Sequence, residues 1–204
     1  MSDYNLTGLN ISAEEFLGAL FEAGDTIGIR IFSDKKGSAF NGLSLEAKQG
    51  HFHAMVDDLK KHNEQNRGIF YVVNFGGHED SKITRINAQF MECDNLSLEK
   101  QLAKIKEFPL EPSLIVKTRN SLHCYWLIKD GKVADFRRIQ RGLIAHFDAD
   151  TKCVNESRVF RIPGFNHTKE EPVMVRSMIH PPIFPLIHSN LQVQTHFLCN
   201  AYPI

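Results

Sequence analysis

The segment that most restricts the fold lies between residues 88 and 162, where strand and helix patterns alternate. Four short runs there are apolar and rich in β-branched or aromatic residues, which is typical of buried strands. Two longer runs carry apolar residues at helical spacing. The six predicted elements are a strand at 88–94, a helix at 97–107, strands at 113–117 and 122–128, a helix at 133–147 and a strand at 158–162. We therefore expect a small sheet with two helices packed against it.

The order β-α-β-β-α-β is the connectivity of a ferredoxin-like unit, which RNA-recognition motifs (RRMs) share. The residues before it predict a second α/β unit, in which Ser12 and Glu15 have the spacing of a helix capping box. The elements predicted there are helices at 12–24 and 44–62 and strands at 26–32 and 68–75. The predicted fold class is therefore α+β, with an RRM-like unit beside an N-terminal α/β unit.

The domain organisation follows from the length and from the absence of any linker-like composition. A chain of 204 residues predicts one domain, at most two small ones. We predict a single domain over 1–204, made of an N-terminal α/β unit at 1–80, an RRM-like unit at 81–175 and an irregular, proline-interrupted tail at 176–204.

Composition excludes several classes of protein. Lys and Arg together number 24, as do Asp and Glu, so the formal net charge is +0. Contact with nucleic acid would therefore have to be local, or be supplied by another domain or partner. The 4 cysteines form no C-x-x-C pair, which argues against structural zinc and a disulfide framework. No apolar run reaches the roughly 18 residues of a membrane helix, and no signal-peptide pattern opens the chain. We expect a cytoplasmic protein with reduced thiols and no membrane contact.

The first candidate for chemistry is the pair Glu92 and Asp94. Side chains at i and i+2 of a strand share a face, so the two carboxylates can converge. Hard divalent cations such as Mg²⁺ or Mn²⁺ take oxygen ligands of this kind. The alternative is an edge strand with two solvated acids.

Polar residues that could bind phosphates follow along the chain. Ser121-Leu122-His123 opens the second strand of the predicted hairpin, although a lone strand histidine can be purely structural. Asp150 then precedes a cluster of three cations, Arg158, Arg161 and Lys169. Arginine forks match phosphate oxygens and lysine acts as a point charge, so these cations could hold a polyphosphate. They could equally be ion-pair partners of the nearby acids.

Taken in order, these motifs resemble the archaeo-eukaryotic primase superfamily, and in particular the RepB-type and primase-polymerase branches of plasmids, phages and integrated elements. The resemblance rests on the acid pair Glu92/Asp94, on Ser121-x-His123, on a third acid, and on the element Arg161-Ile-Pro-Gly-Phe-Asn-His-Thr-Lys169. It covers roughly residues 70 to 170. It implies the archaeo-eukaryotic primase fold, with the active site between the two units.

The resemblance also implies roles for individual residues. Glu92, Asp94 and Asp150 would hold two catalytic metals, Mg²⁺ or Mn²⁺. The nucleotide-binding residues would be Ser121, His123, Arg158, Arg161, Lys169 and, from the hairpin turn, Arg119. Asp148 is the alternative third acid, since it also precedes the arginine element. The implied activity is that of a DNA primase-polymerase, which copies single-stranded DNA from nucleoside triphosphates in mobile-element replication, with a possible helicase domain or partner.

Two other functions are compatible with parts of the sequence. A non-catalytic RRM-like binding module would need exposed aromatic side chains on its sheet. A nickase of the HUH type would use a histidine pair such as His51 and His53, but it needs both on one face of a strand. Here the pair lies within a helical pattern, where residues i and i+2 point apart.

Overall fold

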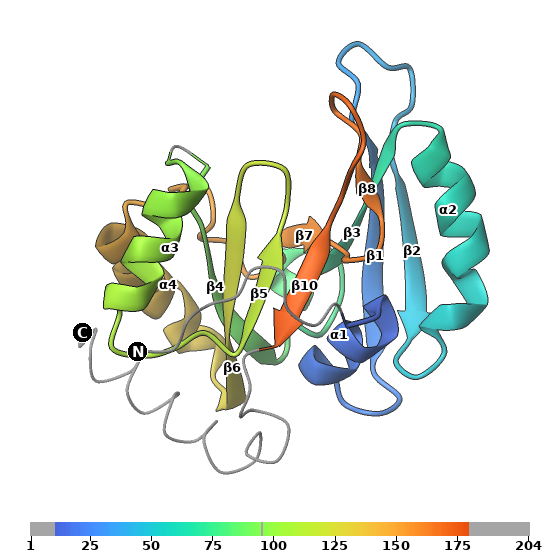
Figure 1. The fold of residues 1–204 in the computed structure, drawn as a ribbon. Helices are drawn as coiled ribbons and strands as arrows, with labels where there is room; N and C mark the ends of the chain where they lie inside the picture. The colour runs from blue at the N-terminus through green and yellow to red at the C-terminus, as the bar shows by residue number, and fades with distance from the viewer. Residues whose placement is uncertain (1–10, 95, 180–204) are drawn as a thin grey trace.

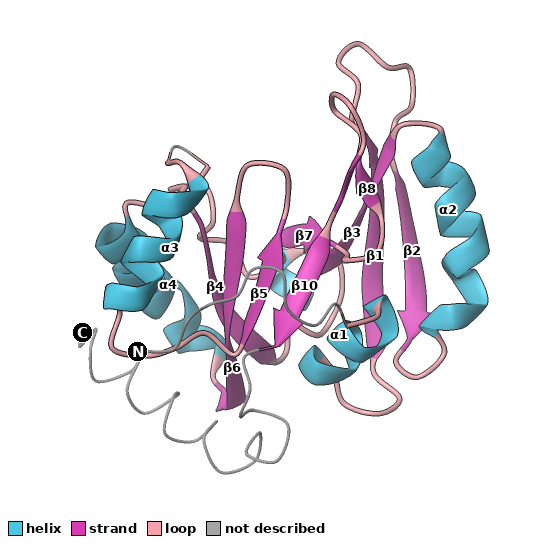
Figure 2. Cartoon of the chain, in the orientation of Figure 1, coloured by secondary structure: helices cyan, strands magenta, loops and turns pink. Residues whose placement is uncertain are grey.

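The computed structural model describes residues 11–94 and 96–179. In this part of the chain two four-stranded antiparallel sheets lie side by side, with helices on their outer sides and one further helix, at residues 13–20, where the two sheets meet (Figures 1 and 2). The first sheet has the order β2 (Leu43–Lys48), β1 (Thr26–Ser33), β3 (Arg67–Val72) and β7 (Val159–Arg161). The second has the order β10 (Arg176–Ile179), β5 (Leu114–Lys117), β6 (Leu122–Gly131) and β4 (Ile86–Glu92). The mixed fold class predicted from the sequence is confirmed.

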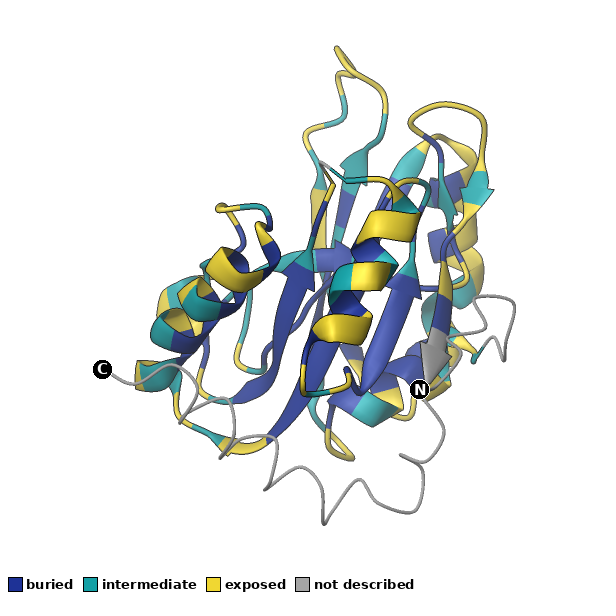
Figure 3. Cartoon of the chain, turned by 60° about the vertical axis from the view of Figure 1, so that its left-hand side comes forward, coloured by how far each residue is buried: buried dark blue, intermediate teal, exposed yellow. Residues whose placement is uncertain are grey.

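Four α-helices, two short 3-10 turns and a small hairpin complete the described structure. The helices are α1 (Ala13–Leu20), α2 (Val56–Glu64), α3 (Leu98–Glu107) and α4 (Val133–Phe147), the 3-10 turns are η1 (Phe52–Met55) and η2 (Asp80–Lys82), and the hairpin pairs β8 (Asn166–His167) with β9 (Val173–Met174). Figure 3 shows buried strands between helices whose outward faces are exposed. No helix among the described residues is long and apolar enough to cross a membrane.

The helix predicted at 12–24 is shorter than expected. Ser12 caps it and Glu15 completes the capping box, as the sequence indicated. It ends at Leu20 because Phe21 adopts an extended backbone, with φ −116° and ψ 146°. This turns the Phe21 ring toward Tyr71 of β3, at a centroid distance of 6.4 Å.

The prediction of a helix over 44–62 is wrong for its first half. Residues 43–48 form β2, which pairs with β1 from Thr26↔Lys48 to Ile31↔Leu43. Their alternation of Leu43, Leu45 and Ala47 with polar residues is the period of a strand, and the edge of β1 supplies the partner. The α-helix begins only at Val56.

The last predicted strand also lies in a different place from the one expected. The strand at 158–162 was assigned to the RRM-like unit, but β7 pairs with β3 in the first sheet, in the register Phe70↔Arg161, Tyr71↔Phe160 and Val72↔Val159. The fourth strand of the second sheet is β10, at residues 176–179, which were expected to open an irregular tail. The rest of that tail lies outside the described residues. The chain therefore crosses from one sheet to the other and back.

Aromatic side chains join the two sheets in one core. Phe16 of α1 is 0% exposed and packs edge-on against Tyr71 of the first sheet and Tyr125 of the second, at 5.6 and 5.9 Å. Phe160 of β7 contacts Phe90 and Tyr125 at 5.2 and 5.8 Å. These contacts fix the relative position of the two sheets, and so of any site built between them.

Candidate active site

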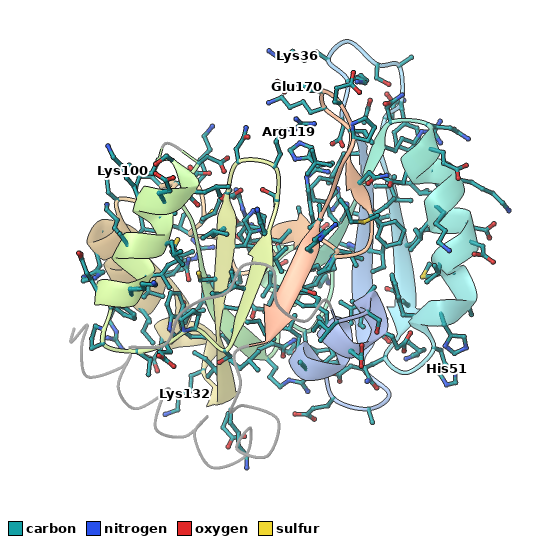
Figure 4. All side chains as sticks on the ribbon, in the orientation of Figure 1. Lys36, His51, Lys100, Arg119, Lys132 and Glu170 are labelled. Atoms are coloured by element: carbon teal, nitrogen blue, oxygen red, sulfur yellow. The ribbon has the colours of Figure 1, made fainter. Side chains whose placement is uncertain are left out.

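A cavity of about 480 Å³ lies where the two sheets meet, and most of the residues selected from the sequence line it. Those residues are Glu92, Asp94, Arg119, His123, Arg158, Arg161 and Lys169. Arg119 and Glu170 mark its rim at one end of the molecule, well away from His51 (Figure 4). Two of the selected residues do not line the cavity: Asp150, and Ser121, which is 1% exposed at the base of the β5–β6 turn.

The centre of the site is a hydrogen bond between Glu92 and His123. The two residues are register partners on β4 and β6, and His123 Nε2 lies 2.9 Å from Glu92 Oε1. The histidine ring also packs on Phe160, at a centroid distance of 4.6 Å. Burial alone would raise the pKa of Glu92, but the charges of His123 and Arg158 outweigh it and lower that pKa to about 2. Glu92 is therefore held as a carboxylate.

Asp94 lies two residues beyond the end of β4 and faces the same cavity. Burial and the neighbouring Glu92 charge raise the pKa of Asp94. The two carboxylates therefore repel each other, as expected for acids that converge on a place for a cation.

Asp150 is held against Glu92 by the backbone. The Asp150 N–H donates to the carbonyl oxygen of Glu92 at 3.0 Å. The Arg158 guanidinium then lies between the two side chains, 3.4 Å from Asp150 Oδ2 and 3.8 Å from Glu92 Oε2. Asp148, by contrast, is an exposed residue in the left-handed conformation at the end of α4. Asp150 therefore lies beside Glu92 and Arg158.

Cys153 lies next to these acids, and potential ligand atoms of Glu92, Asp150 and Cys153 all fall within 4.8 Å of one another. Burial raises the pKa of the Cys153 thiol to about 12, so it stays protonated at neutral pH. Because a metal-bound cysteine must be a thiolate, and Mg²⁺ and Mn²⁺ prefer oxygen, Cys153 acts here as a buried neighbour of the acids.

Arg161 has a partner that sequence reasoning missed. Its guanidinium donates two hydrogen bonds to Asp34, at 2.6 and 3.2 Å, just beyond the end of β1. The backbone N–H and the hydroxyl of Thr168 also donate to Asp34, at 2.8 and 3.0 Å. Burial would raise the pKa of Asp34, but these contacts outweigh it and the pKa is lowered. The pair ties the loop that carries Lys169 to the first sheet.

The basic side of the cavity contains a second residue that was not selected. His167, in β8, lies among Arg119, Arg161 and Lys169. Burial and the charge of Arg161 lower its pKa to about 4, so the ring is neutral at pH 7. Because His167 stands within the motif at residues 161–169, the sequence alone could have indicated it as a site residue. Asp34 has no local signal, because it lies 127 residues from its partner.

Among residues 11–94 and 96–179 the features expected of a nickase are not assembled. His51 and His53 are exposed at η1, not paired on a strand. Tyr125 is followed by Lys129, the spacing of a nickase nucleophile, but Tyr125 is 0% exposed and burial raises its pKa well above the ordinary value. A tyrosine in that state cannot attack a phosphodiester.

The Arg161–Asp34 pair leads to a prediction on stability. Asp34→Asn leaves the Arg161 charge buried without a counter-charge, and we expect a loss of about 3–5 kcal/mol in the free energy of unfolding. Asp58→Asn, which removes an exposed partner of Lys61, is the control and should cause no measurable change. Urea denaturation measures both, and equal stability of the two variants would contradict the structural role of Asp34.

His167 leads to a prediction on pH. The unfolded chain protonates this histidine near its ordinary pKa of 6.5, whereas the folded protein does so only near 4. The folded state therefore binds fewer protons in this window, and its stability falls as the pH drops from about 6.5 to about 4. We expect His167→Gln to flatten that dependence and His53→Gln, on an exposed residue, to leave it unchanged. Urea unfolding at several pH values measures this dependence. If the free energy of unfolding of wild type and of His167→Gln changed in parallel with pH, the lowered pKa assigned to His167 would be contradicted.

Comparison with known proteins adds an independent line of evidence. The model of the RepB DNA-primase N-terminal domain matches residues 79–180, which is half of the chain. No curated protein matches the sequence. Among solved structures, the AEP domain of the cyanophage S-2L primase-polymerase superposes with a TM-score of 0.68 and 25% identity, covering 80% of this chain and 86% of that one.

Two further structures share the fold. Primase RepB′ has a TM-score of 0.60 at 15% identity, covering 93% of this chain and 64% of that chain. The catalytic domain of primase RepB′ in complex with initiator DNA has a TM-score of 0.59 at 16% identity. The match covers 93% of this chain and 96% of that chain. The predicted family resemblance is confirmed. With its acids, histidine and arginines gathered at one cavity between two sheets, the chain belongs to the RepB DNA-primase family and is a DNA primase-polymerase, a nucleotidyltransferase.

Proposed function

We propose that this domain extends or starts strands on a single-stranded DNA template by two-metal nucleotidyl transfer. Glu92, Asp94 and Asp150 are the residues that would hold the metals. The observation that carries the proposal is the convergence of these acids with His123 and Arg158 at the junction of the two sheets.

The donor set suits hard divalent cations. Glu92 and Asp94 repel each other, which a cation between them would relieve. Their donors are carboxylate oxygens, as Mg²⁺ and Mn²⁺ require. When bound, such a pair of ions activates the attacking hydroxyl and stabilises the leaving pyrophosphate.

His123 and Arg158 act on the acids as well as on the substrate. The hydrogen bond from His123 to Glu92 fixes the orientation of both side chains, and Phe160 limits the rotation of the ring. Arg158 holds Glu92 and Asp150 together before the substrate arrives. Both residues line the cavity, which supports the proposal that they contact the phosphates of a nucleotide bound there.

The remaining cations differ in how free they are to bind phosphate. Arg161 is committed to Asp34, so we assign it the role of positioning the loop at residues 166–169. Arg119 pairs only loosely with Glu170 at 3.5 Å, and its Nε and one terminal nitrogen find no hydrogen-bond partner in the described structure. Arg119 and Lys169 are therefore the best candidates for direct contact with the triphosphate. Ser121 does not contact the nucleotide in this proposal. Its backbone is hydrogen-bonded to Thr118 and so shapes the turn that carries Arg119.

The biological setting is inferred from the neighbours. One neighbour is a phage primase-polymerase domain, and another is a RepB′ catalytic domain bound to initiator DNA. Together with the family match, they support replication of a mobile element, with a DNA template and nucleoside triphosphates as substrates. A helicase domain or partner remains a prediction, as does the division of the chain at residues 80 and 175.

The test is a synthesis assay on primed and unprimed single-stranded DNA with Mn²⁺ or Mg²⁺. We expect templated products that disappear with a chelator. Asp94→Asn and Asp150→Asn should each lower the rate at least roughly 100-fold, because each removes a ligand that stabilises charge in the transition state. Asp148→Asn is the matched control and should retain synthesis.

Thermal melting must show that the three variants fold. Synthesis that persists in Asp94→Asn, or that is lost in Asp148→Asn and kept in Asp150→Asn, would contradict the assignment of the acids.

A further inference from the structure

A row of side chains on the first sheet runs from the outer strand into the cavity. Ser44, Arg30, Phe70 and Arg161 are register partners on β2, β1, β3 and β7. Register partners in a sheet point to the same face, so the four side chains form one line across it. Phe70 and Arg161 also line the cavity that holds the acids. The line is therefore continuous with the proposed nucleotide site.

This face is aromatic and basic. Phe32, two residues beyond Arg30 on β1, packs edge-on against Phe70 at 5.5 Å. The Arg30 guanidinium lies over the Phe32 ring at 5.1 Å, and that of Arg161 lies over Phe70 at 4.6 Å. Arg30, Phe32 and Phe70 are each only partly buried, so both rings remain in contact with solvent.

At the centre of this row a glycine leaves the space that the neighbouring side chains occupy. Gly68 is the register partner of Phe32, and a Cβ there would collide with Arg161, Phe70 and Asp34. The opposite face of the sheet carries Ile27, Ile29 and Ile31, each 0% exposed in the core. Packing of the protein therefore uses the isoleucine face, and the rings of the Arg30 face are not needed to fill the core.

Arg30 has a charge that nothing in the described structure neutralises. No carboxylate in residues 11–94 and 96–179 forms an ion pair with it, and its Nε is buried without a hydrogen-bond partner. Arg161, two strands away, is fully compensated by Asp34. An uncompensated cation beside two accessible rings suits a ligand that combines flat bases with phosphates, which is a single nucleic-acid strand.

We propose that the row Arg30–Phe70, with Phe32, is the track of the single-stranded DNA template. Phe32 and Phe70 stack template bases beside the incoming nucleotide, and Arg30 binds a backbone phosphate. This inference rests on the proposed function, in which the domain copies a single strand. It also explains how a chain of formal net charge +0 holds DNA, since stacking and one local cation replace a bulk basic surface.

The test measures binding of fluorescently labelled oligo(dT) of roughly 20 nucleotides by anisotropy over a range of salt concentrations. The variants are Arg30→Gln and Phe32→Leu, which keep most of the side-chain volume and lie outside the cavity lining. The matched controls are Arg67→Gln and Phe40→Leu. Arg67 also lies over a phenylalanine, Phe40, at 4.1 Å, but its register partner Ser33 places it on the isoleucine face.

We expect Phe32→Leu to weaken binding about 5- to 100-fold through lost stacking. Arg30→Gln should weaken it and lower the slope of log Kd against log salt by about 1. Both controls should bind as wild type does, and metal-dependent nucleotide binding should be unchanged in Arg30→Gln and Phe32→Leu.

Three results would overturn the template track: no binding of oligo(dT) by the wild type, unchanged binding in the double variant Arg30→Gln/Phe32→Leu, or an equal loss in the controls. Failure of the proposed function is distinguishable, because it would appear as synthesis that does not depend on Asp94 while strand binding remains intact.

Discussion

The rest of the site depends on the pairing of β7 with β3. This strand has only three residues, yet it leaves the second unit and joins the first sheet. Arg158, directly before it, reaches between Glu92 and Asp150. Phe160 points into the core against Tyr125 and His123, and Arg161 points to the opposite face toward Asp34. Alternation along one short strand therefore places residues in both the acidic and the basic parts of the cavity.

Charge is balanced locally around the cavity. Two arginines are already paired with acids, Arg158 with Glu92 and Asp150, and Arg161 with Asp34. The charge of Glu92 raises the pKa of Asp94, and within residues 11–94 and 96–179 the ion-pair partner of Arg119 is the exposed Glu170. One side of the cavity thus attracts cations and the other attracts anions, which suits a nucleoside triphosphate with its metal ions.

Local patterns predicted much of this arrangement, whereas long-range pairing did not show in the sequence. The helix at 133–147 matches α4 residue for residue, because its apolar stripe and tertiary packing agree. The apolar residues at 52–59 have helical spacing, but the prediction of a helix from residue 44 is wrong, because residues 43–48 alternate and pair with the edge of β1. The sheet that β7 joins, the partner of Arg161 and the aromatic face of the first sheet all depend on contacts between distant segments. The roles of the acids came from the order of motifs, and the structure adds that Asp150, unlike Asp148, is bonded to Glu92.

The most direct test of the proposed two-metal site is the stoichiometry of Mn²⁺ binding. It is followed by electron paramagnetic resonance during titration with and without a non-hydrolysable nucleoside triphosphate. The account predicts that the wild type binds about two ions per chain with the nucleotide present, and that Asp94→Asn and Asp150→Asn lose at least one of them while remaining folded. Full Mn²⁺ binding in both variants would contradict it, because the metals would then lie away from Glu92, Asp94 and Asp150.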